Sequence, residues 1–277
     1  MSLHDVAREL KVHYMTAYRY VRSGRLPARQ HDGEWQVLAS DVKAFATARK
    51  ERGRARKTPA KRGEHSAADW SARLETCLLA GDEMGAERLL EDALVSGHDL
   101  FSLYLDVVSP SLVAIGARWA RGDLQIHEEH RASTIVARLL ARISSRFAHR
   151  GPSLGTVVIG GPSGEHHGLV LTMVADLMRS CGWNVSDIGA DVPAPSFAAA
   201  TKNVDRLRAV CVGVTLRESL PAAKEVVSAV SAAVADDVII YVGGAAIQSE
   251  AGARALGADA WSQDPRTLVA HLAAHAS

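Results

Sequence analysis

The chain has 277 residues, 47% of them hydrophobic, and a formal net charge of +1. This length accommodates two or three domains, and no uninterrupted apolar run approaches the roughly 18 residues of a membrane span. The first residues lack the basic segment and apolar run of a secretory signal. We therefore expect a cytoplasmic protein with no membrane partner, in which Cys77, Cys181 and Cys211 stay reduced because their spacing fits neither a metal site nor a disulfide framework.

The charge is divided unevenly along the chain. Residues 1–62 contain 15 Lys and Arg against 6 Asp and Glu, a net charge of +9, whereas residues 63–277 contain 17 against 25, a net charge of −8. A basic segment joined to an acidic body predicts that the N-terminal part binds a polyanion. Within it, residues 49–66 carry eight basic side chains and almost no large apolar ones, which predicts a flexible linker.

The first 48 residues have the pattern of a winged helix-turn-helix. Apolar spacing predicts helices over residues 4–10, over 14–23 and, after a cap at Ser40-Asp41, up to about Lys50. Between the second and third helices, residues 26–37 predict a two-stranded ribbon that turns at Asp32-Gly33.

This N-terminal pattern resembles the excisionase/MerR-like DNA-binding module. The resemblance implies that the second helix enters the major groove of double-stranded DNA while the ribbon contacts the flanking backbone. The residues expected to contact DNA are Tyr14, Thr16, Tyr18, Arg19, Arg22, Arg25, Arg29 and His31. The alternative is a small helical domain with a solvated basic face.

Residues 67–150 predict an antiparallel four-helix bundle, because four amphipathic stretches follow one another with short connections. The third stretch, 100–120, contains Pro110, which predicts a kink or a break. Where the third stretch meets the fourth, Trp119 is followed after nine residues by Glu129-His130, with His127 close by. From the residues alone, the favoured interpretation is that Trp119 is a core residue beside a solvated helix start, where Glu is stabilised by the helix dipole.

Residues 151–277 alternate apolar runs with amphipathic stretches, which predicts a parallel sheet with helices on both faces. The expected strands are 156–161, 184–191, 209–214 and 238–244, and the expected helices are 168–181, 195–203, 221–235 and 249–256. In such sheets, ligands bind beyond the carboxyl ends of the strands. The candidate binding residues at these ends are Glu165, His166, His167, Asp191, Val192, Val214, Thr215, Gly243 and Gly244.

Two further functions of this region stay open at this point. Residues 160–164, Gly-Gly-Pro-Ser-Gly before a helix, could bind phosphate, although the Lys of a Walker motif and the GxGxxG spacing are missing. His166 and His167 could belong to a zinc site, although no set of Cys or carboxylate partners is evident in the sequence.

Residues 67–275 resemble the cobalamin-binding unit of the CarH/LitR-type photoreceptor repressors, and with the N-terminal module the resemblance covers nearly the whole chain. It implies a multidomain α and α/β protein. A winged helix-turn-helix would occupy residues 1–48, a four-helix bundle residues 67–150 and a Rossmann-like (flavodoxin-like) parallel sheet residues 151–277. Adenosylcobalamin would lie between the bundle and the sheet.

The resemblance also implies roles for single residues. His167 would ligate cobalt, Glu165 would bond its other ring nitrogen, and Gly243-Gly244 would leave room for the displaced nucleotide tail. Three positions depart from the family pattern. Val170 replaces a Gly, Thr215 must supply the hydroxyl that Gly213 lacks, and Ala120 follows the Trp where some members have a His that becomes an upper ligand.

On the opposite face of the cofactor, the resemblance implies that Trp119 packs over the upper axial group. Glu129, His130 and His127 would line the adenosyl pocket, and His127 or His130 would have to replace the missing upper ligand.

By this resemblance the protein is a light-responsive transcriptional regulator and a repressor, not an enzyme. Light would break the cobalt–carbon bond, change a homo-oligomer (a dimer or a tetramer) and release an operator in double-stranded DNA. The alternatives are a cobalamin- or tetrapyrrole-binding regulator that is not driven by light, and a corrinoid carrier of the methyltransferase type.

Overall fold

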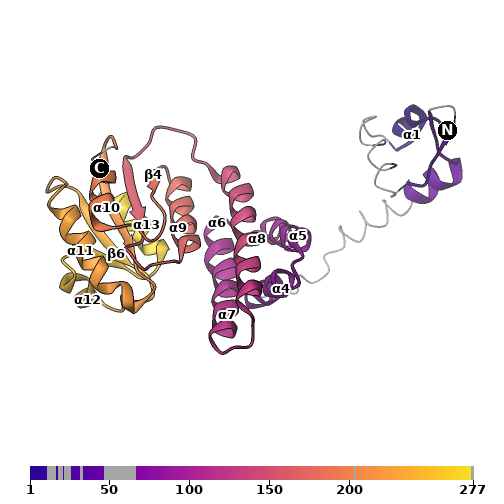
Figure 1. The fold of residues 1–277 in the computed structure, drawn as a ribbon. Helices are drawn as coiled ribbons and strands as arrows, with labels where there is room; N and C mark the ends of the chain where they lie inside the picture. The colour runs from indigo at the N-terminus through magenta and orange to yellow at the C-terminus, as the bar shows by residue number, and fades with distance from the viewer. Residues whose placement is uncertain are drawn as a thin grey trace. The chain divides into compact units, whose positions relative to one another are not determined.

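The computed structural model describes residues 1–10, 17, 21, 26–31, 34–46, 67–202 and 204–275. These residues belong to two compact units, Met1–His65 and Ser66–Ser277 (Figure 1). Most of the residues expected to contact DNA lie outside the described residues: Tyr14, Thr16, Tyr18, Arg19, Arg22 and Arg25. The expected linker over 49–66 lies outside them as well.

The N-terminal unit has a small apolar core. Helix α1 (Leu3–Glu9) begins at Ser2, whose hydroxyl accepts the Asp5 amide hydrogen while the Asp5 carboxylate accepts that of Ser2. Strands β1 (Arg29–His31), which contains two of the expected DNA contacts, and β2 (Glu34–Gln36) are antiparallel, so the ribbon is confirmed. The buried side chains of this unit include Leu3, Val6, Leu10, Ala17, Val21, Leu26, Val37 and Val42.

The helix after the ribbon begins earlier than the sequence predicts. Residues 39–46 are helical, and the carbonyl of Leu38 accepts the amide hydrogens of Asp41 and Val42. Ser40-Asp41 therefore lies inside the first turn, and the predicted cap at these residues is wrong by about half a turn.

The second unit starts with the helical bundle. Its helices are α4 (Ala67–Ala80), α5 (Glu83–Val95), α6 (Leu100–Ser102), the π-helical η1 (Leu103–Val108), α7 (Ser109–Ala120), α8 (Ile126–Ser144) and the short 3₁₀ helix η2 (Ser145–Phe147). Segments α6, η1 and α7 follow one another without a gap, so the elements form the four rods that the sequence predicts (Figure 1).

The third rod is not broken at Pro110. Proline has no amide hydrogen and its ring collides with the carbonyl four residues earlier, here that of Asp106. The π-helical η1 ends at Val108, two residues before Pro110, and its wider turn leaves room for the ring, so the chain stays helical. By length and composition, Leu100–Ala120 is the one helix of the described residues that could cross a membrane. In this structure Leu103, Tyr104 and Val107 lie in the core of the unit.

The rest of the unit is a five-stranded parallel sheet in the order β4-β3-β5-β6-β7. The strands are β3 (Thr156–Gly160), β4 (Asn184–Asp187), β5 (Leu207–Gly213), β6 (Ile239–Gly243) and β7 (Ala260–Ser262). The helices are α9 (Gly168–Ser180), α10 (Ala194–Thr201), η3 (Arg217–Ser219), α11 (Leu220–Ser231), α12 (Glu250–Ala255) and α13 (Pro265–Ala274). This is the flavodoxin-like strand order, and the expected Rossmann-like fold is confirmed. Strand β7 and helix α13 were not predicted from the sequence.

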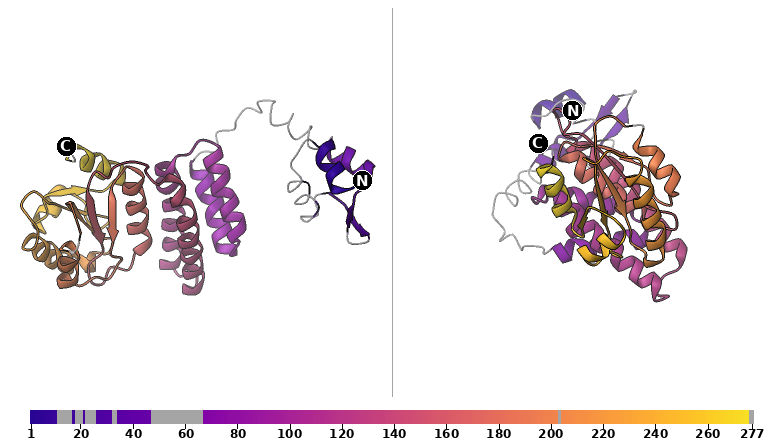
Figure 2. Two further views of the ribbon diagram at one scale, coloured as in Figure 1. Left: turned by 90° about the horizontal axis from the view of Figure 1, so that it is seen from above. Right: turned by 90° about the vertical axis from the view of Figure 1, so that its left-hand side faces the viewer.

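Helices cover both faces of the sheet (Figure 2). Alternate residues of a strand point to opposite faces. Val157 and Ile159 of β3 belong to the core that includes α9 and α13, whereas Val158 belongs to the core under α10, α11 and α12. The first of these cores continues into the helical bundle, so the bundle and the α9 face share one apolar interior.

Two polar contacts also join the bundle to the α/β part. The Tyr104 hydroxyl donates to Oδ2 of Asp176 on α9 at 3.3 Å, and Arg179 donates to the other carboxylate oxygen at 2.9 Å. Arg266 of α13 donates to both carboxylate oxygens of Asp106, at 2.9 and 3.0 Å. Tyr104 and Asp106 both lie in η1, so the π-helical segment carries both contacts.

We expect Tyr104→Phe to lower the free energy of unfolding by about 1 kcal/mol, because the buried Asp176 loses one hydrogen bond. Tyr241→Phe is the matched control, since Tyr241 is also a buried residue but its hydroxyl makes no hydrogen bond among the described residues. Urea unfolding of the full chain, followed by circular dichroism, measures both. Equal losses in the two variants would contradict the role of the Tyr104–Asp176 contact.

Candidate functional site

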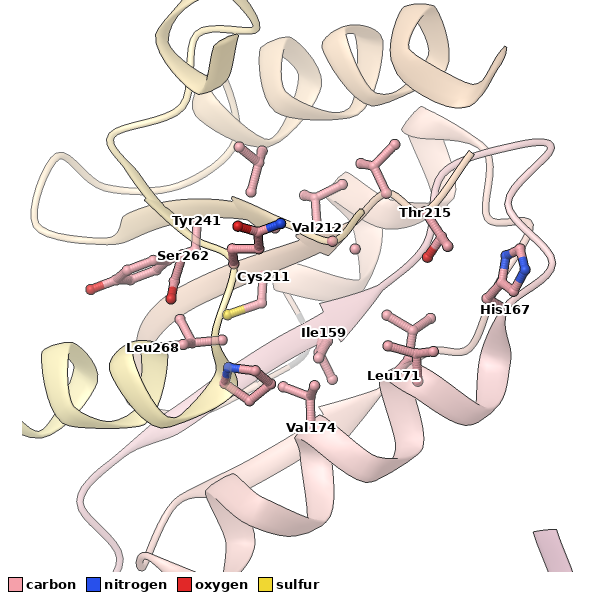
Figure 3. A pocket seen from close by; sticks show the side chains of 18 of the residues that line it. Ile159, His167, Leu171, Val174, Cys211, Val212, Thr215, Tyr241, Ser262 and Leu268 are labelled. Atoms are coloured by element: carbon pink, nitrogen blue, oxygen red, sulfur yellow. The ribbon is translucent and has the colours of Figure 1, made fainter. Parts of the chain in front are cut away.

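A pocket of about 90 Å³ opens beside His167 at the carboxyl ends of β3, β5 and β6 (Figure 3). The point where the strand order reverses, between β3 and β5, is where ligands bind in such sheets. Of the predicted site residues, the structure brings six to this pocket: Glu165, His167, Val214, Thr215, Gly243 and Gly244. We call this space the sheet pocket.

Other residues of the sheet pocket were not predicted as binding residues. Helix α9 contributes Val170, Leu171 and Val174, and the segment from β7 into α13 contributes Ser262, Gln263, Pro265 and Leu268. Strand β7 has three residues, too few for a clear pattern. Helix α13 did carry a signal, because Asp264 followed by Pro265 is a typical helix start, and Asp264 does cap it.

Glu165 is the buried anchor of the site, with an exposure of 1%. One oxygen accepts the backbone amide and the ring Nδ1 of His167, at 3.1 and 2.5 Å. The other accepts the amides of Thr215 and Leu216 after β5, at 2.5 and 3.1 Å. Burial alone would raise the pKa of Glu165, but these hydrogen bonds outweigh it and lower the pKa to about 2. Glu165 therefore holds a negative charge and ties the β3 loop to the β5 loop.

His167 presents one free ring nitrogen. A carboxylate can only accept hydrogen bonds, so Nδ1 carries the proton and Nε2 keeps its lone pair. The side chain is 44% exposed and lies at one end of the sheet pocket, with Tyr241 at the other end (Figure 3). The hydrogen bond to Glu165 raises the pKa of His167 against the opposing effect of burial, and the negative charge of Glu129 raises it further. The imidazole is thus oriented and made more basic.

Asp191 and Val192 hold the loop of His167 and do not line the sheet pocket. Asp191 has a φ of +59°, and its carboxylate accepts the Gly164 amide hydrogen at 2.8 Å. The amide of Val192 donates to the carbonyl of Gly161, whose own amide donates to Gly189. The amides of Gly161 and Gly164 are therefore occupied, which counts against a phosphate-binding loop at 160–164. His166 is exposed and does not line the pocket either.

Gly243 and Gly244 are required by neighbouring backbone as well as by the pocket. A β-carbon on Gly243 would lie 2.6 Å from the carbonyl oxygen of Ser262, and one on Gly244 would lie 2.5 Å from that of Val214. Gly244 also has a φ of +108°, which favours glycine. The interpretation that these glycines only leave room for a ligand is therefore incomplete.

The predicted upper-face residues lie at the turn between α7 and α8. Trp119 is 47% exposed, so the interpretation as a core residue is wrong. Glu129 accepts from the Ser133 hydroxyl at 2.6 Å, and its other oxygen lies 2.5 Å from Nδ1 of His130. His130 and His127 are exposed. Because the Glu129 charge affects the pKa of His167, the start of α8 is within electrostatic reach of the sheet pocket.

The side chains at this site fit a metal ion that is already coordinated by most of its ligands before it binds the protein. Among the described residues, no group of three His, Cys, Asp or Glu could hold a metal ion, so the zinc alternative has no support there. A corrin ring supplies four equatorial nitrogens to cobalt and leaves one axial position to the protein. One imidazole with a fixed Nδ1 proton and a free Nε2 meets that requirement.

Comparisons with known families assign three parts of the chain. Residues 1–50 match a helix-turn-helix domain, and residues 70–144 and 155–270 each match a B12 binding domain. The two B12 matches cover the bundle and the parallel sheet, the two parts that carry the upper-face residues and the sheet pocket.

Relatives with corrinoid names match the same region. Trimethylamine corrinoid protein 1 of Methanosarcina acetivorans is 26% identical over 199 residues, covering 70% of this chain and 90% of that protein. Dimethylamine corrinoid protein of Methanosarcina barkeri is 28% identical over 161 residues, covering 56% and 74%.

A solved structure, that of the Methanosarcina barkeri monomethylamine corrinoid protein, has the same fold. It superposes with a TM-score of 0.63 at 16% identity and covers 75% of this chain and 98% of that one. Together with the family matches, these findings support a cobalamin-binding protein that carries a helix-turn-helix domain.

Proposed function

We propose that the protein is a transcriptional regulator that senses light through adenosylcobalamin held between the helical bundle and the sheet. It would act as a repressor rather than as an enzyme. The observation that carries the proposal is the Glu165–His167 pair: a single oriented imidazole at the switch point of a B12 binding domain, in a chain that also has a helix-turn-helix domain.

On the lower face, Nε2 of His167 would ligate cobalt. Glu165 supports this role because it fixes the tautomer and raises the basicity of the ring. Asp191 and Gly164 hold the loop in place, so the imidazole stays aimed at the same point. The nucleotide tail, displaced by His167, would enter the sheet pocket that starts beside the ring.

On the upper face, Trp119 would pack against the axial group of the cofactor. Its half-exposed indole offers an apolar surface, and the neighbouring Glu129, His130 and His127 offer polar groups to an adenosyl moiety. Ser133 and His130 orient the Glu129 carboxylate, so this face is also preorganised. Adenosylcobalamin supplies a cobalt–carbon bond that visible light breaks.

After that event, Trp119 would lose its packing partner and the bundle would lose one of its attachments to the α/β part. In the dark, a dimer or tetramer would present several helix-turn-helix domains to one operator, which raises affinity through effective concentration. Separation of the copies would then release the DNA without a change in any base contact. This is a two-state switch biased by ligand contacts.

A corrinoid carrier for methyl transfer is the second candidate. The relatives named as corrinoid proteins favour it, because the match covers 90% of the length of the M. acetivorans protein. The helix-turn-helix domain at residues 1–50 favours the regulator.

Light is the direct test of the first candidate. Protein loaded with adenosylcobalamin in the dark should show an irreversible change in the absorbance of the cofactor under green light. The illuminated protein should then elute as a smaller species on gel filtration. Trp119→Ala should retain the cofactor but show a weaker size change, because the indole is the contact that light removes. Val113→Ala, an exposed position on the same helix, is the matched control and should behave as wild type. A light-stable methylated form that turns over with a methyl donor would favour the carrier.

Acid should compete with cobalt for His167. Because its pKa is raised, Nε2 takes up a proton at a higher pH than an ordinary imidazole, and a protonated Nε2 cannot ligate. Histidine-bound absorption should therefore disappear as the pH falls, with a midpoint below the pKa of the free imidazole because cobalt competes with the proton for Nε2. Glu129→Gln should move the midpoint of this loss to lower pH in an absorption titration, while the neighbouring Glu128→Gln leaves it in place. An unchanged midpoint in Glu129→Gln contradicts the electrostatic coupling between α8 and the site.

A further inference from the structure

The inner wall of the sheet pocket is apolar. Beyond His167, the side chains that line its middle are Ile159, Leu171, Val174, Cys211 and Leu268 (Figure 3). Burial raises the pKa of the Cys211 thiol to about 12, so that group is neutral. Apart from Glu165 and His167 at the mouth, no described residue that lines the pocket is ionisable at neutral pH.

Leu171 and Gly213 shape this wall together. A β-carbon on Gly213 would lie 2.5 Å from Cδ2 of Leu171, so the leucine occupies the space that any side chain at position 213 needs. The strand therefore offers no hydroxyl at that point, and the helix fills it with hydrocarbon. Val170, one residue earlier on α9, adds an exposed apolar side chain to the lining beside the buried Leu171.

The hydroxyl groups of the pocket lie away from its middle or are already bonded. Thr215 lies at the mouth beside His167, and the hydroxyl of Tyr241 points away from His167 at the opposite end (Figure 3). The Ser262 hydroxyl donates to the carbonyl of Asp264 at 2.7 Å. The amide of Gln263 is the one other polar side chain among the described lining residues. A polar group placed between these ends would therefore find one amide, with hydrocarbon and a thiol around the rest of it.

We propose that the sheet pocket selects corrinoids by the polarity of the base at the end of their nucleotide tail, with Leu171 and Gly213 as the residues that set the preference. This inference rests on the proposed binding of cobalamin. A base with hydrocarbon edges, dimethylbenzimidazole, fits the wall. Adenine carries an amino group and additional ring nitrogens, more polar atoms than the single amide of Gln263 can pair. Burying the remainder unpaired weakens binding by about tenfold or more.

Entry of either base also requires movement. The pocket volume of about 90 Å³ is smaller than the roughly 150 Å³ of an apolar cavity that binds benzene. A bicyclic base therefore displaces side chains, among them Leu171, which lines the pocket and packs against Gly213. The Leu171–Gly213 contact, which excludes a hydroxyl at position 213, must therefore separate when the base enters.

The test compares three adenosyl corrinoids in the dark: cobalamin, the corresponding corrinoid with adenine as its base, and cobinamide, which lacks the nucleotide tail. Dissociation constants come from filtration with absorbance detection, and the spectrum reports ligation by His167. We expect cobalamin to bind at least about tenfold more tightly than the adenine form, and more tightly than cobinamide. The preference should shrink in the double variant Leu171→Ala/Gly213→Ser, which brings a hydroxyl into the wall.

Leu169→Ala is the matched control, because Leu169 is on α9 but does not line the sheet pocket. Equal affinity for cobalamin and the adenine form overturns the selectivity, and so does cobinamide that binds as tightly as cobalamin. Should the double variant fail to fold, the affinities of the wild-type protein for the three corrinoids still test whether the pocket is selective. If no corrinoid binds, or His167→Ala leaves every spectrum unchanged, the proposed cobalamin site itself is wrong and the selectivity falls with it.

Discussion

The candidate site depends on one buried carboxylate that four hydrogen bonds keep ionised. Glu165 takes two of them from the loop after β3 and two from the loop after β5, so the two strands at the switch point are joined through a single side chain. A buried charge without partners would be costly, and here every bond favours the charged form. The result is an imidazole with a defined tautomer on a defined loop, which is what a single axial metal ligand requires.

The surrounding backbone is arranged around the same point. Asp191 adopts a left-handed conformation that a non-glycine residue rarely takes, and its carboxylate closes the loop through Gly164. Gly243 and Gly244 let β6 approach Ser262 and Val214 more closely than a β-carbon allows. On the bundle side, η1 carries Tyr104 and Asp106 to α9 and α13. The two halves of the proposed cofactor site are therefore held together by contacts outside it.

The sequence predicted the layers well and the pocket walls poorly, for physical reasons. Buried parallel strands are continuous apolar runs, so β3, β5 and β6 could be recognised in the sequence. Strand β7 has only three residues, too few to show a hydrophobic pattern. Glu165 and His167 were found because they lie two residues apart in the loop that follows a predicted strand. The Leu171–Gly213 contact joins residues 42 positions apart, and no local pattern records it. Likewise, Pro110 predicts a disturbed helix but cannot indicate that a π-helical turn absorbs it.

The central claim is that a histidine of this chain, and not the base of the cofactor, occupies the lower axial position of cobalt. Electron paramagnetic resonance of the cobalamin-loaded protein in its Co(II) state tests this directly, using protein grown with ¹⁵N-labelled histidine. A protein nitrogen as ligand predicts that each cobalt line is split into two by ¹⁵N, where unlabelled protein gives three by ¹⁴N. Three-fold splitting that survives the labelling would assign the ligand to the cofactor's own base and contradict the account.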